Sequence, residues 1–235
     1  MAAKSKALAA VAAILVIGGG WLAWDSMRRD DSSVASSNAP SSLQNPVSGS
    51  NAAREVLATH RSDAMVNRYA CKGDPARCET ELLGANSAEE AQWLRDRGYP
   101  SRDQIDAGRS FSVEQLRLQA NDSGALVDVN LYAQGLLREQ RHREALGVLL
   151  DSFATEGNLY ALHLVADVHA NSQELKNLPL AMAYLRLAYL AGDAKAGTVL
   201  AERFSSAAPA ELAYADKRAA ELRSQLNPGG TWPRP

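Results

Sequence analysis

Aromatic side chains are scarce in this chain, and neither sign of charge dominates it. Phe, Trp and Tyr make up 6% of the 235 residues, whereas hydrophobic residues make up 46%. Alanine and leucine therefore supply much of the apolar content, and such residues suit closely packed helices better than a β-sandwich. The formal net charge of −2 gives no overall attraction for nucleic acid. The composition predicts an all-α fold and no nucleic-acid partner.

The sequence also lacks the common signatures of catalysis and of cofactor or metal binding. It contains no GxSxG, SxxK, HExxH or GxxxxGK[ST] motif. His163 and His169 are six residues apart, which places them on different faces of one helix. We therefore expect a protein that is not an enzyme, with no catalytic residue, no cofactor and no metal ion. An exported cell-envelope enzyme whose site is assembled from scattered residues stays open as an alternative.

Long apolar runs are absent except near the start of the chain, within residues 1–29. Residues 7–24 form an uncharged run of 18 residues behind two lysines. As a helix this run spans roughly 27 Å, about the thickness of a bilayer's hydrocarbon core. Trp21 and Trp24 at its far end suit the membrane interface. We expect a single-pass anchor of bacterial inner-membrane type with a periplasmic C-terminal domain. A cleaved secretory signal, which would leave a soluble periplasmic protein, is the alternative.

The next segments predict a spacer and a short cysteine-containing region. Residues 30–51 are rich in Ser, Asn, Ala and Pro and cannot bury enough apolar surface to offset their ordering entropy, so they read as a flexible linker. Residues 52–86 read as a helical segment that carries Cys71 and Cys78, the only two cysteines. In an oxidising compartment this pair could form a local disulfide, whereas in a reducing one it would remain two thiols.

Internal recurrence is the strongest signal, and it covers residues 87–226. Four similar segments start 37, 33 and 35 residues apart, at Ser87, Gly124, Gly157 and Gly192. That spacing is typical of one helix-turn-helix unit, and it predicts an α/α solenoid of about three to four repeats behind the membrane helix and linker. A plain helical bundle is the alternative. Residues 227–235 are expected to be a disordered tail.

Each unit divides into a first helix, A, and a second helix, B. In the second unit the apolar spacing predicts A from Ala125 to Arg138 and B from Arg141 to Phe153. Asn177 before Pro179 predicts the start of B in the third unit. Pro209 opens the last helix. The first unit is interrupted by GYPSRDQIDAG, which predicts a turn and a short extra helix.

Two stretches resemble known repeat families. YAQGLLREQRHREALGVLL, from Tyr132 to Leu150, resembles a tetratricopeptide helix-turn-helix. GNLYALHLVADVH, followed by LAMAYLRLAYLAGDAKAGTVLA, is similar to the Sel-one-like arrangement. The resemblance covers roughly Gly124 to Leu226 and is weaker from Ser87. It departs from the repeat pattern at Asp128. These families imply α/α solenoids that commonly scaffold complexes, and they specify no partner.

These observations favour a membrane-tethered, extracytoplasmic scaffold or adaptor that binds another protein or peptide. The membrane contact is made through residues 7–24, and a structural subunit of a membrane complex is a further alternative. Two kinds of side chain are candidates for the partner surface: polar A-helix residues, and a basic cluster at one turn that could receive a carboxylate. The candidate partner-binding residues are Asn130, Gln134, Arg138, Arg141, Arg143 and His163.

Overall fold

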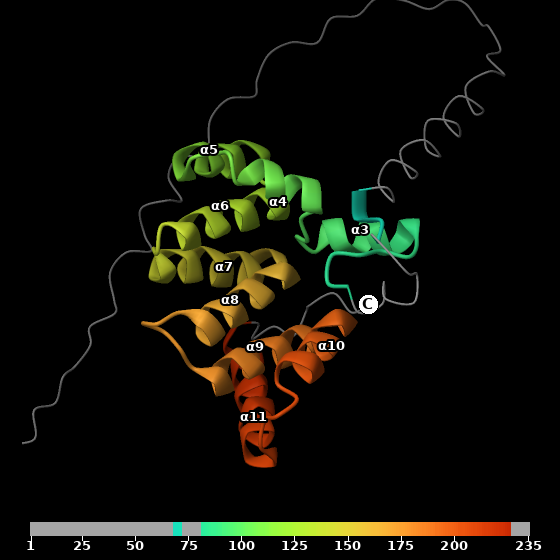
Figure 1. Cartoon of the computed structure of the whole chain (residues 1–235), viewed down its shortest axis with the longest axis vertical. Helices are drawn as coiled ribbons and strands as arrows, with labels where there is room; N and C mark the ends of the chain where they lie inside the picture. The colour runs from blue at the N-terminus through green and yellow to red at the C-terminus, as the bar shows by residue number, and fades with distance from the viewer. Residues whose placement is uncertain (1–67, 72–80, 227–235) are drawn as a thin grey trace, which may run out of the picture. The chain divides into compact units, whose positions relative to one another are not determined.

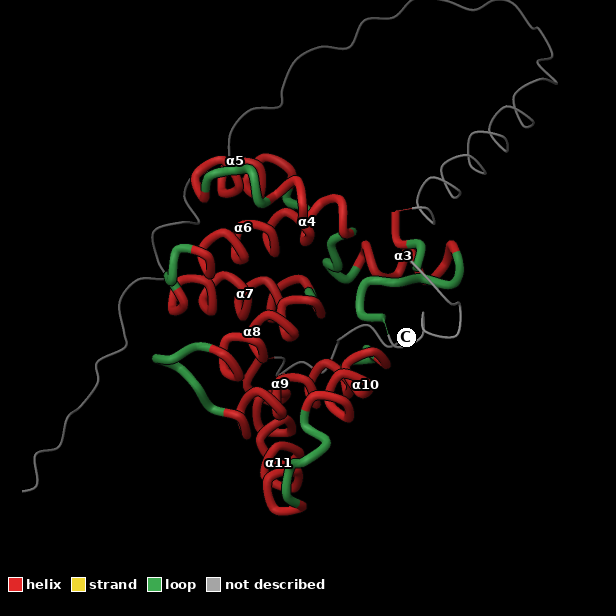
Figure 2. The backbone as a smooth tube through the Cα atoms, viewed as in Figure 1, coloured by secondary structure: helices red, strands yellow, loops and turns green. Residues whose placement is uncertain are grey.

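The computed structural model describes residues 68–71 and 81–226. Within these residues every named element is a helix, and neighbouring helices pack against one another (Figures 1 and 2). The predicted all-α fold is therefore confirmed for this part of the chain. None of the described helices combines the length and apolar character needed to span a bilayer. The predicted anchor at 7–24, linker at 30–51 and tail at 227–235 lie outside the described residues, as does most of 52–86 before residue 81.

The described helices alternate with short connections along the chain. In order they are α3 (Ala88–Asp96), α4 (Arg102–Gly108), α5 (Val113–Ser123), α6 (Leu126–Arg138), α7 (His142–Glu156), α8 (Leu159–Asn171), α9 (Leu178–Leu190), α10 (Ala194–Arg203) and α11 (Pro209–Leu226). Helices α6, α8 and α10 are the predicted A helices, and α7, α9 and α11 are the predicted B helices. Helix α4 is the short extra helix expected in the first unit.

Glycines set the boundaries between units. Gly124 and Gly157 lie just beyond the ends of α5 and α7, with φ of 61° and 71°. Gly192, with φ of 103°, follows α9. These are left-handed backbone conformations, which glycine adopts without the Cβ penalty of other residues. At the other end of α9, Asn177 caps the helix by accepting a hydrogen bond from the Leu180 amide at 3.0 Å. The predicted helix ends are confirmed at these positions.

The helices from α5 to α9 are layered in chain order. Each packs against the next, and α9 also contacts α10 and α11 (Figure 1). Alternate helices touch as well, because α6 contacts both α4 and α8. Short connections between antiparallel neighbours produce this order. The A helices α6 and α8 therefore lie next to each other, which brings equivalent residues of successive units close together.

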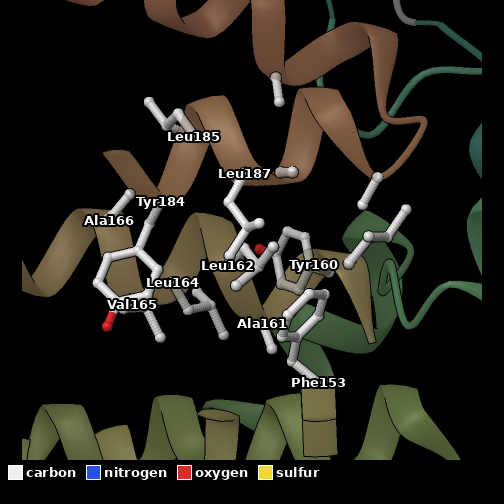
Figure 3. Close-up of a cluster of buried hydrophobic side chains, with 14 of the residues drawn as sticks. Phe153, Tyr160, Ala161, Leu162, Leu164, Val165, Ala166, Tyr184, Leu185 and Leu187 are labelled. Carbon is white, nitrogen blue, oxygen red and sulfur yellow. The ribbon is translucent and has the colours of Figure 1, made fainter. Parts of the chain in front are cut away.

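The main core lies where α7, α8 and α9 meet. Figure 3 shows Phe153 of α7, Leu162 of α8 and Leu187 of α9 in this cluster. Most residues of α8 and α9 are buried, since other helices cover more than one face of each. Alanines between the larger side chains let the helix axes approach closely. Helix α8 is therefore held rigidly, and so are the polar side chains that it carries.

Candidate functional site

Polar side chains recur at two equivalent positions in successive units. Asn130 in α6 and His163 in α8 each lie six residues after the glycine that opens their unit. Asn158 and Asp193 each lie one residue after such a glycine, where they cap the N-termini of α8 and α10. We call these four residues together with Lys195 the A-helix face. Its members are almost completely buried, since at most 7% of any of them is exposed.

The recurrence extends to the hydrogen bonds. Asn130 Nδ2 donates to Asn158 Oδ1 at 2.9 Å, and Asn158 Nδ2 donates back to Asn130 Oδ1 at 3.0 Å. One unit later, His163 Nε2 lies 2.5 Å from Asp193 Oδ2. In both cases a residue in the middle of one A helix binds the capping residue of the next A helix. The contact is neutral in the first pair and ionic in the second when His163 is protonated.

A segment from the start of the described region covers this face. We call residues 81–101, which include α3, the covering segment. Asn130 Nδ2 donates to the carbonyl of Gly98 at 2.7 Å, and the Tyr160 amide donates to the carbonyl of Arg97 at 3.2 Å. Tyr99, the residue after Gly98, donates a hydrogen bond from its hydroxyl to Asp193 Oδ2. Successive residues of the covering segment thus meet successive pairs of the A-helix face.

Tyr99, in the covering segment, is surrounded by aromatic rings and hydrogen-bond partners. It is fully buried, and its ring centroid lies 5.0 Å from that of Tyr160 and 5.8 Å from that of His163. Trp93 contacts the ring from within the covering segment, at 5.8 Å between centroids. Tyr69 donates its hydroxyl to the carbonyl of Tyr99 at 2.7 Å. Aromatic packing and a hydroxyl–carboxylate bond therefore hold one tyrosine on the A-helix face.

The third A helix, α10, holds the other end of the covering segment. Lys195 Nζ donates to the carbonyls of Glu81 at 3.1 Å and Gly84 at 2.8 Å. The same ammonium lies 3.0 Å from Glu90 Oε1 in α3. A buried ammonium needs such a set of acceptors to offset its desolvation. Helices α6, α8 and α10 thus each hold a different part of one segment.

Burial and neighbouring charge shift the pKa values of two groups at this site. Burial raises the pKa of Tyr99 well above its usual value, and the charge of Asp193 raises it further. Burial alone would raise the pKa of Asp193, but the hydrogen bond and charge of His163 and the hydrogen bond from Tyr99 together hold it below its usual value. Tyr99 is therefore a neutral donor and Asp193 an ionised acceptor near neutral pH.

The predicted polar A-helix residues differ in their surroundings. Asn130 and His163 are buried, and the Asn130 amide and His163 Nε2 are hydrogen-bonded within the chain. Gln134 is half-buried, and its Nε2 has no hydrogen-bond partner among the described residues. The structure brings Asn130 and His163 onto one face, under the covering segment. Whether they bind a partner remains a prediction.

The predicted basic cluster is bound to acceptors within the chain. Arg138 donates to the carbonyls of Gly108 and Phe111 at 3.2 and 3.3 Å. Arg141 forms a bidentate ion pair with Glu144, and Arg143 pairs with Glu174 at 2.6 Å. The three arginines come from one turn, yet each points to a different acceptor. Their role in partner binding remains a prediction.

The predicted disulfide lies at the edge of the described region. Cys71 is disulfide-bonded, whereas Cys78, its predicted partner, lies outside the described residues. A Cβ atom on Gly84 would lie 2.5 Å from Cys71 Sγ. The sulfur therefore packs directly against the residue whose carbonyl Lys195 binds.

A second, open surface lies between α9 and α10. It is a groove of about 630 Å³ whose lining includes Arg186, Tyr189 and Thr198. Thr198 lies six residues after Gly192, the same position that Asn130 and His163 hold in their units. Tyr189 is 45% exposed, and the Arg186 guanidinium lies 5.4 Å from the centre of its ring. The Arg186 guanidinium also pairs with Asp216 at 2.7 Å, so Tyr189 is the exposed aromatic side chain of this groove beside a neutralised cation.

Comparisons with protein-family models, curated proteins and solved structures give no match for this chain. The resemblance to Sel-one-like and tetratricopeptide repeats therefore remains a prediction. Among residues 68–71 and 81–226, no group of three or more His, Cys, Asp or Glu side chains is arranged to hold a metal ion.

Four residues of the site were not among the predicted candidates: Tyr99, Asn158, Asp193 and Lys195. A local signal existed for two of them, since Asn158 and Asp193 are polar residues placed directly after the glycines that open units, where a helix cap is expected. Tyr99 and Lys195 carried no local signal. Their partners lie 94 and 111 residues away along the chain.

Proposed function

We propose that this chain is a membrane-tethered, extracytoplasmic α/α solenoid that acts as a scaffold or adaptor by binding a segment of another protein. The observation that carries the proposal is the periodic A-helix face. Two equivalent pairs, Asn130 with Asn158 and His163 with Asp193, each contact the covering segment. A surface that repeats with the helical unit suits a polypeptide segment whose successive residues meet successive units.

The way in which the covering segment is held supports this proposal. Two of its carbonyls, at Arg97 and Gly98, accept hydrogen bonds from α8 and α6. Backbone contacts of this kind add affinity for a polypeptide segment through its main chain, and side-chain pockets such as the one around Tyr99 add specificity. Because α8 is fixed by the core on both sides, little ordering is needed when a segment binds.

The predicted tether would add to the strength of binding. A helix at residues 7–24 would hold the domain at the membrane, and a linker at residues 30–51 would let it search nearby. Attachment to the same membrane as a partner raises the effective concentration of each for the other. This arrangement favours an adaptor for membrane-bound proteins.

Crosslinking in native membranes, followed by affinity capture, tests the proposal. The full-length tagged chain is compared with a shortened chain that begins at Asn51. We expect both to recover the same partner, with a lower yield for the shortened chain because it lacks the tether. Failure of both to recover any partner, despite correct folding and localisation, would contradict the scaffold function.

A matched pair of tyrosine variants shows which surface the partner uses. Tyr189→Ala alters the open groove between α9 and α10, whereas Tyr214→Ala alters α11. Both tyrosines are exposed, 45% and 52%, so neither change opens the core. Loss of the partner with Tyr189→Ala alone would assign the groove to partner binding. Equal recovery with both variants would assign binding to another surface.

A further inference from the structure

We propose that the A-helix face recognises a segment containing a Gly-Tyr pair with the glycine in a left-handed turn, and that Gly98 and Tyr99 of this chain occupy that face as a ligand in cis. A partner that presents a Gly-Tyr turn of this kind would then bind by displacing them. This inference rests on the proposed function and specifies the chemistry of the partner. It follows from the fit of Gly98 to the pair Asn130–Asn158 and of Tyr99 to the pair His163–Asp193.

The first position admits only glycine. Gly98 has a φ of 83°, a backbone conformation that other residues rarely adopt. A Cβ atom there would collide with Asn158 Oδ1 and lie 2.7 Å from Asn130 Nδ2. Both amides are locked by their reciprocal hydrogen bonds, so neither can move aside without breaking the first pair. A competing segment therefore needs glycine at this place.

The second position selects tyrosine over other aromatic residues. Its ring fits against Tyr160 and His163, and its hydroxyl reaches the carboxylate of Asp193. Phenylalanine would fill the same space but would leave the buried carboxylate without one of its donors. Asp193 keeps its bonds to His163 and to the Lys195 amide, so the face stays ordered when the hydroxyl leaves.

The covering segment is attached differently from the repeat helices. Helices α5 to α9 pack along their lengths, whereas α3 packs less extensively against other helices. Among the described residues, the polar links between the covering segment and the face include the bonds to Asn130, Tyr160, Asp193 and Lys195, and the buried side chains of Leu94 and Tyr99 also join the main core. Opening the segment would expose these side chains but would leave the packing of α6 on α7 and of α7 on α8 in place.

Rebinding of a labelled peptide tests the proposal. The probe is a fluorescein-labelled peptide with the sequence of residues 95–103, RDRGYPSRD, and binding is followed by fluorescence anisotropy. The protein is the full-length chain in detergent micelles, compared with its Gly98→Ala variant, in which the clash loosens the cis segment. We expect the variant to bind the peptide at least about tenfold more tightly than the wild type, because its face is open more of the time. A peptide with alanine at both the Gly and Tyr positions should not bind.

Circular dichroism first establishes whether each variant is folded. If Gly98→Ala fails to fold, Tyr99→Phe replaces it, since that change removes only one hydroxyl; the expected gain is then about threefold. A folded variant that binds the peptide no more tightly than the wild type would overturn the proposal. Recovery of a partner in the crosslinking experiment alongside such a result would leave the scaffold function standing. Rebinding without any captured partner would support the Gly-Tyr face and count against the scaffold.

Discussion

At the scale of single residues, two equivalent pairs of side chains join successive A helices, one pair through amides and the other through a carboxylate. Asn130 and Asn158 form a neutral amide pair, whereas His163 and Asp193 form the equivalent pair with a carboxylate. Asp193 also caps α10 by accepting a hydrogen bond from the Lys195 amide at 3.0 Å. The second pair should therefore make stability depend on pH, and the first should not.

Asp193→Asn should remove this pH dependence while keeping the cap, since an asparagine oxygen also accepts from an amide. The folded-state pKa of Asp193 is lowered, so its contribution to the free energy of unfolding is present above the unfolded carboxyl value near about 3.9 and is lost as pH falls through the lower folded value. We expect the variant to lose about 3 kcal/mol at pH 7. Urea unfolding between pH 2 and pH 7 should show a shallower acid slope for the variant. An unchanged slope would mean that Asp193 does not titrate differently on folding.

Replacing either of two uncrowded glycines by alanine should change the stability of the chain, but in opposite directions. Gly147 lies within α7, and no atom lies close to the place that an alanine methyl group would take, so Gly147→Ala should stabilise the chain by about 1 kcal/mol through helix propensity. Gly124 has equally open space but a φ of 61°, so Gly124→Ala should destabilise it by about 1 kcal/mol. Thermal unfolding of the two variants should shift in opposite directions. Shifts of the same sign would contradict the assigned conformation at one of them.

At the scale of helices, α10 links the covering segment to the repeats. It buries only Lys195 and Ala196 completely, and the lysine reaches two carbonyls and one carboxylate of residues 81–90. Helix α10 therefore binds the covering segment through a charged side chain, whereas α8 and α9 contact their neighbours mainly through apolar side chains. Loss of that charge should loosen one end of the covering segment and leave the α8–α9 core intact.

Lys195→Met tests this role, because methionine keeps most of the apolar stem and removes the ammonium. Residues 81–90 lose their donor and should exchange amide hydrogens at least about tenfold faster, with no change in α8. Hydrogen exchange followed by mass spectrometry measures this, and Lys217→Met on the exposed part of α11 is the matched control. Equal protection of residues 81–90 in both variants would show that Lys195 does not hold them.

The helix ends could be predicted because their signals are local. Gly157 and Gly192 require left-handed backbone, and Asn177 with Pro179 marks a helix start, so short stretches of sequence contain all the information. The contacts of the face could not be predicted in this way. Nothing near Tyr99 in the sequence indicates a carboxylate 94 residues away. Asp128, which breaks the repeat pattern, is explained by its acceptor bonds from Gln119 and Ser123 of α5.

At the scale of the whole molecule, the described helical region has its proposed recognition face already filled by its own chain. The filling segment lies between the predicted anchor and the repeats, and its Gly84 contacts the sulfur of the disulfide-bonded Cys71. The α6–α9 helices would serve as the fixed part and residues 81–101 as the part that opens.

Native-state hydrogen exchange of the full-length chain at increasing, sub-denaturing urea tests this division most directly. We predict that amides of residues 81–101 open together, with a free energy below that of α6 to α9, because α3 packs less extensively against other helices than α6 to α9 do. If these amides instead exchange only through the same global unfolding that exposes α8, the covering segment belongs to the core. That result would contradict the proposal of a displaceable ligand in cis.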